Sequence, residues 1–196
     1  ITLGRELPVH SLDEILTDRT EIYRELQKYY TAINSMNEIK LTLYEDSYSL
    51  YNLYRFAHYY EAAYGKYVWL KSGASLVIEH TEAMTVIDVN TGSVLKKKHQ
   101  EDTLFYQINK EAAKEIARQL RLRNISGIIM IDFINMKDTR QKEKIVSLLE
   151  NECKKDRIHC DVVDMTALNL VEMTRSKIRR PLYEQIAMCQ KNKKRY

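Results

Sequence analysis

Two short apolar stretches constrain the fold of this chain more than any other feature of its sequence. They read TEAMTVIDVNTG at residues 81–92 and GIIMIDFINM at residues 127–136. Both are rich in Ile and Val and too short for a typical helix, a pattern that predicts buried strands. Each carries an aspartate near its carboxyl end, Asp88 and Asp132, in the same local pattern Ile-Asp-apolar. The chain must therefore satisfy two carboxylates inside apolar strands.

A carboxylate in such a strand costs free energy unless a cation or hydrogen-bond donors satisfy it. Open α/β sheets bind their ligands at the carboxyl ends of the strands, where Asp88 and Asp132 would converge. With the amide oxygen of Asn90 they would form an all-oxygen site suited to Mg²⁺ or Mn²⁺. A single aspartate at a strand end more often caps the following turn or helix. Because two occur in matched contexts, a metal site and capping are equal alternatives at this point.

The composition is that of a folded protein with a mildly basic surface. The 196 residues suit one domain, or one domain and part of another, and 44% hydrophobic with 30% charged residues can form a normal core. A net charge of +4 is compatible with a polyanionic partner without requiring one. The sequence has neither a long apolar run nor a signal-peptide pattern, so we expect a cytoplasmic protein. Because it begins with Ile1 rather than Met, we expect a fragment or a processed product.

The three cysteines are odd in number and widely spaced, at Cys153, Cys160 and Cys189. This spacing indicates neither a disulfide framework nor a pair of zinc ligands, and it suits a reducing cytosol. We therefore expect no zinc in this chain.

Periodicity and capping signals predict an α/β fold. We expect three helices, one from about Arg19 to Ile33 capped by Asp18, one over 110–122 capped by Asn109, and one that begins at Asp138 or Thr139. The helix over 110–122 joins the two aspartate strands and predicts a parallel, right-handed βαβ unit. Further strands are expected at 41–44, 67–70, 75–78, 160–165 and 168–174.

Residues 44–67 are unusually rich in tyrosine, and their central part, 53–63, is expected to be helical. Such tyrosines could stack on RNA bases, but they more often pack a core with the hydroxyl group at the surface, and we favour that interpretation. A run of three lysines, Lys96, Lys97 and Lys98, follows the first aspartate strand. Lysine runs are usually solvated loops. Here the run lies just beyond the expected metal, so contact with an RNA backbone is an alternative.

Residues 69–182 resemble the catalytic core of the RNase E/RNase G endoribonucleases. The matching stretches are WLKSGASLVIEHTEAMTVIDVNTG, INKEAAKEIARQLRLRNISGIIMIDFINM and DRIHCDVVDMTALNLVEMTRSKIRRPL, in the order and spacing of that family. Residues 12–66 are less closely similar to part of the ribonuclease-H-like subdomain that precedes this core. The resemblance implies a mixed sheet flanked by helices, with a partial ribonuclease-H-like subdomain at 1–66, a deoxyribonuclease-I-like catalytic subdomain at 67–190 and a basic tail at 191–196.

The resemblance also implies a function. The implied protein is a Mg²⁺-dependent endoribonuclease that cuts single-stranded RNA and leaves 5′-phosphate and 3′-hydroxyl ends. The family's two metal-binding aspartates fall on Asp88 and Asp132, and its supporting asparagine falls on Asn90. A basic position that holds the RNA 5′-phosphate falls on His159, with Arg157 beside it. We add Arg175, from the basic C-terminal region, to the residues expected to contact RNA.

Some features of the family are missing from this sequence. The regions of the oligonucleotide-binding (OB) type and the 5′-monophosphate sensor have no counterpart here. Where a zinc-linking Cys-Pro-x-Cys motif is expected after Leu182, the chain has only Cys189. A homodimer through the catalytic subdomain would therefore not be linked by zinc.

Two other functions remain open from the sequence. The first is an RNA-binding or assembly module that keeps the fold with weak catalysis. The second is a different Mg²⁺-dependent phosphoryl enzyme, because paired aspartates at strand ends recur on several α/β folds.

Overall fold

The computed structural model describes residues 13–33, 39–92, 101–166 and 168–193. The chain divides into two compact units, residues 1–60 and 61–196. The sequence placed this boundary slightly later, after residue 66. The basic tail expected at 191–196 begins within the last helix, α7 (Leu182–Lys193), which the sequence did not predict.

The first unit is a small α/β element. Strands β1 (Glu14–Thr17) and β2 (Lys40–Leu43) pair in parallel, and helix α2 (Thr20–Ala32) connects them. Leu26 and Tyr30 of α2 pack with Ile39 in a small core. The predicted helix is confirmed, but its predicted cap is wrong. The N-cap is Arg19 rather than Asp18, and its side chain makes no capping hydrogen bond.

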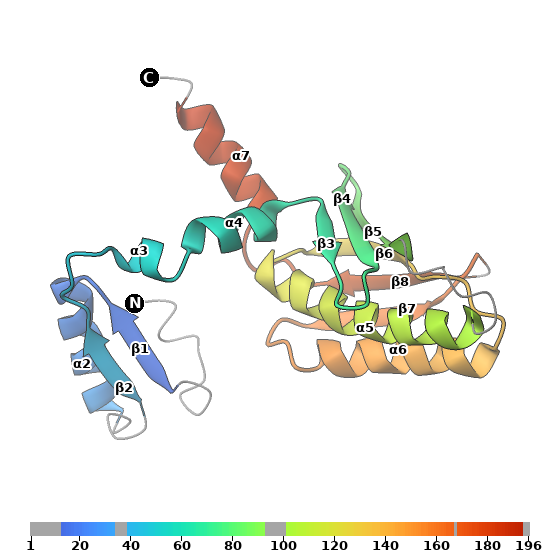
Figure 1. Ribbon diagram of the computed structural model, residues 1–196, viewed down its shortest axis with the longest axis horizontal. Coiled ribbons are helices and arrows are strands. Elements are labelled where there is room, and N and C mark those ends of the chain that lie inside the picture. The colour runs from blue at the N-terminus through green and yellow to red at the C-terminus, as the bar shows by residue number, and fades with distance from the viewer. Residues whose placement is uncertain (1–12, 34–38, 93–100, 167, 194–196) are drawn as a thin grey trace. The chain divides into compact units, whose positions relative to one another are not determined.

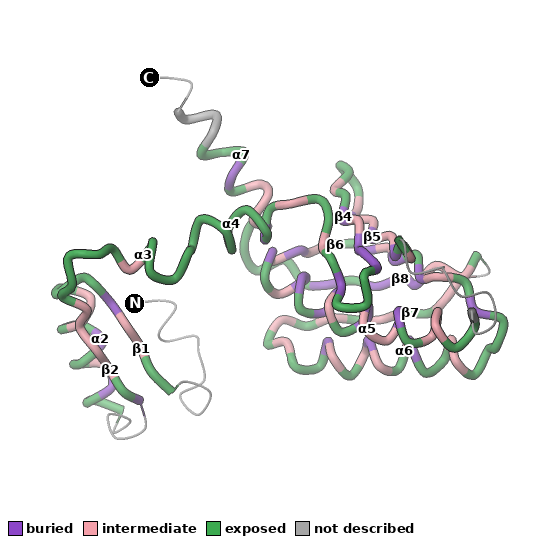
Figure 2. Tube along the Cα trace, viewed as in Figure 1, coloured by how far each residue is buried: buried purple, intermediate pink, exposed green. Residues whose placement is uncertain are grey.

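The tyrosine-rich stretch forms two short helices, α3 (Leu50–Leu53) and α4 (Phe56–Tyr64). Core packing was the favoured interpretation of its tyrosines, and for most of them it is wrong. Figure 2 shows α3 and α4 to be largely exposed. The exposed members are Tyr48, Tyr51, Tyr54, Tyr59, Tyr60, Tyr64 and Tyr67.

The second unit is built on one six-stranded mixed sheet (Figure 1). The strands lie in the order β3-β4-β5-β6-β8-β7. Only β5 and β6 are parallel neighbours, as the βαβ prediction requires, and the other adjacent pairs are antiparallel. The strands are β3 (Tyr67–Trp69), β4 (Ser75–His80), β5 (Met84–Asn90), β6 (Gly127–Asp132), β7 (Cys160–Met165) and β8 (Leu170–Arg175).

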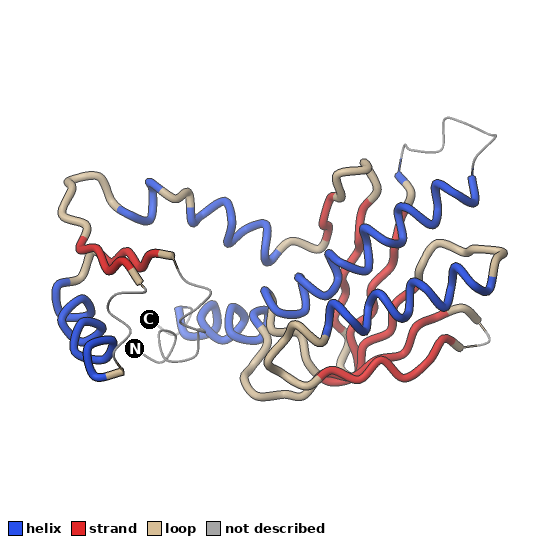
Figure 3. The backbone as a smooth tube through the Cα atoms, turned by 90° about the horizontal axis from the view of Figure 1, so that it is seen from below, coloured by secondary structure: helices blue, strands red, loops and turns tan. Residues whose placement is uncertain are grey.

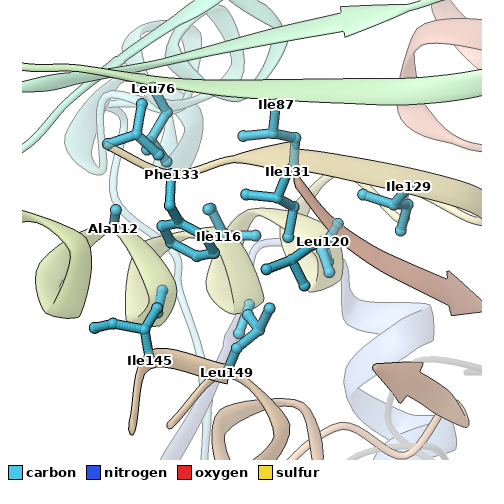
Figure 4. Packing of buried hydrophobic residues seen from close by; sticks show 14 of the residues in the cluster. Leu76, Ile87, Ala112, Ile116, Leu120, Ile129, Ile131, Phe133, Ile145 and Leu149 are labelled. Atoms are coloured by element: carbon cyan, nitrogen blue, oxygen red, sulfur yellow. The ribbon is translucent and has the colours of Figure 1, made fainter. Parts of the chain in front are cut away.

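Two helices, α5 (Glu101–Leu122) and α6 (Thr139–Cys153), lie along one face of this sheet (Figure 3). Side chains alternate between the two faces of a strand, and on β5 the buried residues are Thr85, Ile87 and Val89. Figure 4 shows such strand residues directed at Ile116 and Leu120 of α5. The core of the second unit therefore lies between the sheet and these helices.

The helix predictions for this unit are confirmed in type but not in every boundary. Helix α6 begins at Thr139, one of the two predicted starts, and Asp138 is its N-cap, whose side chain accepts a hydrogen bond from the backbone N–H of Arg140 at 2.9 Å. Helix α5 begins at Glu101, so the prediction that Asn109 caps a helix is wrong, and Asn109 lies in its middle. Across the described residues, no helix combines the length and apolar character needed to cross a membrane.

Candidate metal site

Asp88 and Asp132 are direct partners in the parallel register of β5 and β6. Paired residues on adjacent strands point to the same face of a sheet. Their neighbours Ile87 and Ile131 are fully buried against the helices, so both carboxylates lie on the opposite face. Asp88 is half-buried and Asp132 exposed. The structure thus brings together the two aspartates that the sequence singled out.

Asn90 lies at the carboxyl end of the same strand as Asp88 and on the same face. Its Nδ2 donates a hydrogen bond to Oδ2 of Asp88 at 2.7 Å. This bond uses the amide nitrogen, so the amide oxygen remains available as a ligand. The three side chains therefore present only oxygen atoms to an incoming cation.

The electrostatics of the pair favour a bound cation. Although Asp132 is exposed as a whole residue, partial desolvation of its carboxyl group, and then the nearby negative charge of Asp88, raise the pKa of Asp132 above its ordinary value of 3.8. Both causes disfavour the ionised carboxylate in the folded protein, and a divalent cation between the two groups would reverse the effect of the second.

The donor set fits Mg²⁺ or Mn²⁺ better than a softer metal. Two carboxylates and an amide oxygen are hard ligands, and Mg²⁺ commonly keeps several waters beside one or two carboxylates. Within the described ranges, no group of three or more His, Cys, Asp or Glu side chains could hold a metal ion. The acidic ligands that the site could supply are therefore two, Asp88 and Asp132.

A buried asparagine supports the loop that follows Asp132, and the sequence gave it a different role. Asn109 is fully buried in α5. Its Nδ2 donates to the carbonyl of Ile134 at 2.8 Å, and its Oδ1 accepts from the N–H of Ile134 at 3.1 Å. An asparagine inside an otherwise apolar helix face is the sequence signal that could have revealed this role.

The segment after Asn90 packs closely against the turn between β3 and β4. Gly92 has a φ of +56°, and a Cβ atom there would lie 2.8 Å from the carbonyl oxygen of Gly73. The carboxylate of Glu111 holds the same turn, because it accepts hydrogen bonds from the backbone N–H of Lys71 at 2.6 Å and of Ser72 at 3.2 Å. Helix α5 therefore anchors segments next to both β5 and β6.

The residues predicted to contact RNA have different surroundings. Lys96, Lys97 and Lys98 lie outside the described residues. Arg157 and His159 are exposed just before β7, where His159 Nε2 lies 3.0 Å from Oδ2 of Asp161.

Arg175 does not match the prediction. It is buried on the helix side of β8, where its Nε donates to Asp156 Oδ2 at 2.9 Å and its Nη1 donates to the carbonyl of Ile125 at 2.8 Å. Its guanidinium group stabilises the fold and is not positioned to contact a phosphate.

A pocket of about 450 Å³ lies away from the carboxylates. His80, in the pocket wall, pairs with Thr85 near the start of β5. Asn90 is the last residue of that strand, so the pocket lies toward the opposite end of β5. Arg123, also in its wall, donates to the carbonyls of Gly65 at 2.7 Å and Ala62 at 3.4 Å, at the end of α4. The positively charged guanidinium group of Arg123 thus binds carbonyl groups at a helix C-terminus, so we assign Arg123 a structural role. The pocket is lined by residues 63–66, 78–80, 123, 182 and 183.

The fold and the site together define a class: an α/β domain that pairs two carboxylates on neighbouring strands, with oxygen donors of the kind that suit a hard divalent cation. Comparison with known proteins identifies the family. The model of the Ribonuclease E/G family matches residues 2–178. Ribonuclease G of Escherichia coli strain K12 is 38% identical over 175 residues, which are 89% of this chain and 36% of that protein.

Two further relatives agree with this match. Ribonuclease G of Haemophilus influenzae is 38% identical over 172 residues, covering 88% of this chain and 35% of the relative. Ribonuclease E of Escherichia coli strain K12 is 34% identical over 168 residues, covering 85% of this chain and 16% of the relative. The chain belongs to the ribonuclease E/G family, and it spans little more than a third of the length of the ribonuclease G proteins it matches.

Proposed function

We propose that this chain carries the catalytic centre of a Mg²⁺-dependent endoribonuclease acting on single-stranded RNA. The observation that supports this most directly is the register of Asp88 with Asp132, which pairs two carboxylates on the face of the sheet opposite α5 and α6. Family membership supports RNA as the substrate, because the relatives are named ribonucleases.

In this proposal each site residue has a definite task. Asp88 and Asp132 hold the metal, and Asn90 orients the Asp88 carboxylate through the hydrogen bond at 2.7 Å. Bound Mg²⁺ supplies Lewis-acid chemistry, lowering the pKa of a coordinated water and neutralising charge on the scissile phosphate. The products are RNA ends with a 5′-phosphate and a 3′-hydroxyl. Mn²⁺ would bind to the same ligands.

The finer architecture is also a proposal. We assign the sheet with α5 and α6 to a deoxyribonuclease-I-like catalytic subdomain, and the first unit to part of a ribonuclease-H-like subdomain. Arg157 and His159 are exposed and remain proposed phosphate contacts, as do Lys96, Lys97 and Lys98. We propose a cytoplasmic location and, for any homodimer, contact through the catalytic subdomain without a zinc link.

The test is cleavage of a 5′-monophosphorylated, A/U-rich single-stranded RNA, with and without Mg²⁺. Asp88→Asn and Asp132→Asn keep the side-chain shape but remove the charge that holds the metal. We expect each to lower the cleavage rate by at least about a hundredfold, because loss of preorganised charge stabilisation has effects of this size.

The matched control is Asp164→Asn, an exposed strand aspartate. Its side chain accepts a hydrogen bond from the backbone N–H of Met165 at 2.7 Å, which an asparagine oxygen can also accept. This variant should cleave like the wild type. Full activity in Asp132→Asn would refute the metal assignment. RNA binding without cleavage under every metal condition would instead favour an RNA-binding or assembly module.

A further inference from the structure

Two exposed aromatic residues share the face of the sheet that carries the carboxylates. Strand β3 is the edge strand next to β4. Tyr67 of β3 pairs with Val77 of β4, which pairs with Asp88 of β5. Because each pair shares a face, Tyr67 and Asp88 point to the same side of the sheet.

The neighbouring row of the sheet repeats this arrangement. Trp69 pairs with Ser75, and Ser75 pairs with Asn90. The side chains of Tyr67 and Trp69 are thus neighbours on one face of β3, about 7 Å apart along the strand. Since adjacent strands lie about 4.8 Å apart, the Trp69 backbone is about 10 Å from that of Asn90.

Neither aromatic side chain serves the core. Trp69 is 73% exposed, the highest value among the aromatic residues of the described ranges, and Tyr67 is 57% exposed. Val68, between them, points the other way and packs against the core. The alternation on β3 therefore holds the strand in place through Val68 and leaves the two rings on the carboxylate face.

The two rings differ in what already touches them. The ammonium group of Lys66 lies 5.9 Å from the centroid of the Tyr67 ring, and Lys66 also forms an ion pair with Glu79. Within the described part of the chain, Trp69 makes no ring contact and no side-chain hydrogen bond. The indole face is thus available to a planar ligand.

We propose that Trp69, with Tyr67 beside it, is a platform on which an unpaired base of single-stranded RNA stacks, next to the scissile phosphate at the metal site of Asp88 and Asp132. This inference rests on the proposed function and extends it by naming a base-binding site. Aromatic rings bind bases with little sequence preference because every base has a π face. A side chain in line with Asn90 and about 10 Å away can reach the base of a nucleotide adjacent to that phosphate.

Trp69 is the single tryptophan of the chain, so its fluorescence reports on the platform directly. The measurement uses the full chain carrying Asp132→Asn in a buffer with a chelator, so that RNA is bound without being cut. Titration with an unstructured oligoribonucleotide should quench the Trp69 emission in a saturable way. A matched oligonucleotide with abasic sites should give a much smaller change at equal charge.

Binding to labelled RNA, followed by anisotropy, tests the energetics. Trp69→Ala should weaken binding at least about fivefold, the lower limit expected for one stacked base, while Trp69→Phe should recover part of the loss. The dependence of affinity on salt should keep its slope in Trp69→Ala, because no phosphate contact is removed. The matched control Tyr59→Ala removes a ring of similar exposure, 66%, outside the sheet and should bind like the parent.

Some results would overturn the platform, and they are separable from failure of the proposed function. Unquenched Trp69 emission at saturating RNA would overturn it, as would equal losses in Trp69→Ala and Tyr59→Ala. So would emission that shifts with protein concentration alone, which would mean that another copy of the chain covers the ring. If the wild-type chain cuts RNA while Trp69→Ala binds normally, the platform fails and the nuclease stands. If the wild-type chain cuts no RNA, but RNA quenches Trp69 emission and Trp69→Ala weakens RNA binding, the platform stands and the nuclease fails.

Discussion

Asn109 exchanges two hydrogen bonds with the backbone of Ile134, two residues beyond Asp132. The side-chain amide thereby behaves like the backbone of an additional strand, donating to the carbonyl and accepting from the N–H of the same residue. Helix α5 packs on the face opposite the carboxylates, so this contact reaches the site from behind. It links the position of a core helix to the loop that follows Asp132, a proposed metal ligand.

Replacement of Asn109 by alanine should therefore loosen that loop. Two partly buried backbone groups of Ile134 lose their partner, and an unsatisfied buried group costs at most about 1–3 kcal/mol. We expect a lower free energy of unfolding and, in the folded population, weaker Mn²⁺ binding measured by electron paramagnetic resonance. Asn151→Ala, on the exposed side of α6, should change neither quantity. Unchanged Mn²⁺ affinity in Asn109→Ala would limit Asn109 to a purely structural role.

Asp132 should reduce stability at neutral pH when no divalent cation is present. Its pKa is raised in the folded protein, first by burial and then by Asp88. The folded state therefore binds more protons than the unfolded state between the ordinary pKa of 3.8 and the raised value, and stability falls as pH rises through that window.

The Asp132→Asn variant removes this penalty. In a chelating buffer it should melt at a higher temperature than the wild type at pH 7, and the difference should shrink as the pH falls toward 4. Added Mg²⁺ should raise the melting temperature of the wild type but not of the variant, because only the wild type retains both metal ligands. A lower melting temperature for Asp132→Asn at pH 7 without metal would contradict this account.

Arg175 should contribute to stability rather than to RNA binding. It and Asp156 form a buried ion pair with side chains only 2% and 8% exposed. Removing one partner leaves the other charge buried, so Arg175→Ala should lower the free energy of unfolding by about 3 kcal/mol or more. Arg118→Ala breaks a similar contact, to Glu115 at 3.2 Å, at a position where the arginine side chain is 57% exposed, and it should cost less than about 1 kcal/mol.

Urea denaturation followed by Trp69 emission compares these two variants within the same unit. If Arg118→Ala proved as destabilising as Arg175→Ala, burial of the ion pair would not be the cause. RNA affinity in the folded fraction of Arg175→Ala should match that of the wild type.

Short apolar runs rich in Ile and Val, the repeated Ile-Asp pattern and the helix between them were enough to predict β5, β6, their parallel pairing and the aspartates they bring together. These features depend on local sequence and on the burial of alternate residues, which a single sequence displays. The role of Asn109 depends on a contact 25 residues away in the chain, and the burial of Arg175 on an ion pair across 19 residues. The helix periodicity marks Asn109 as a polar residue on an apolar face, but no local pattern names the partner of either residue, so both were misassigned.

The tyrosine-rich stretch shows a different limit. Its aromatic content favoured a core position, because most aromatic side chains are buried in folded domains. The helices it forms are short and expose the rings instead. Composition identified an unusual segment but could not say whether anything packs against it.

The placement of both helices on one face of the sheet separates two kinds of selective pressure. On β5 and β6, residues such as Ile87 and Ile131 are required for folding. Under the proposed function, their immediate neighbours Asp88 and Asp132 are required for RNA cleavage. A saturation mutagenesis scan read out once for protein abundance and once for RNA cleavage should give two sensitivity maps that interleave residue by residue along these strands. A lineage could then alter substrate preference at β3 while its abundance stays nearly constant, because the residues that change are not those that fold the chain.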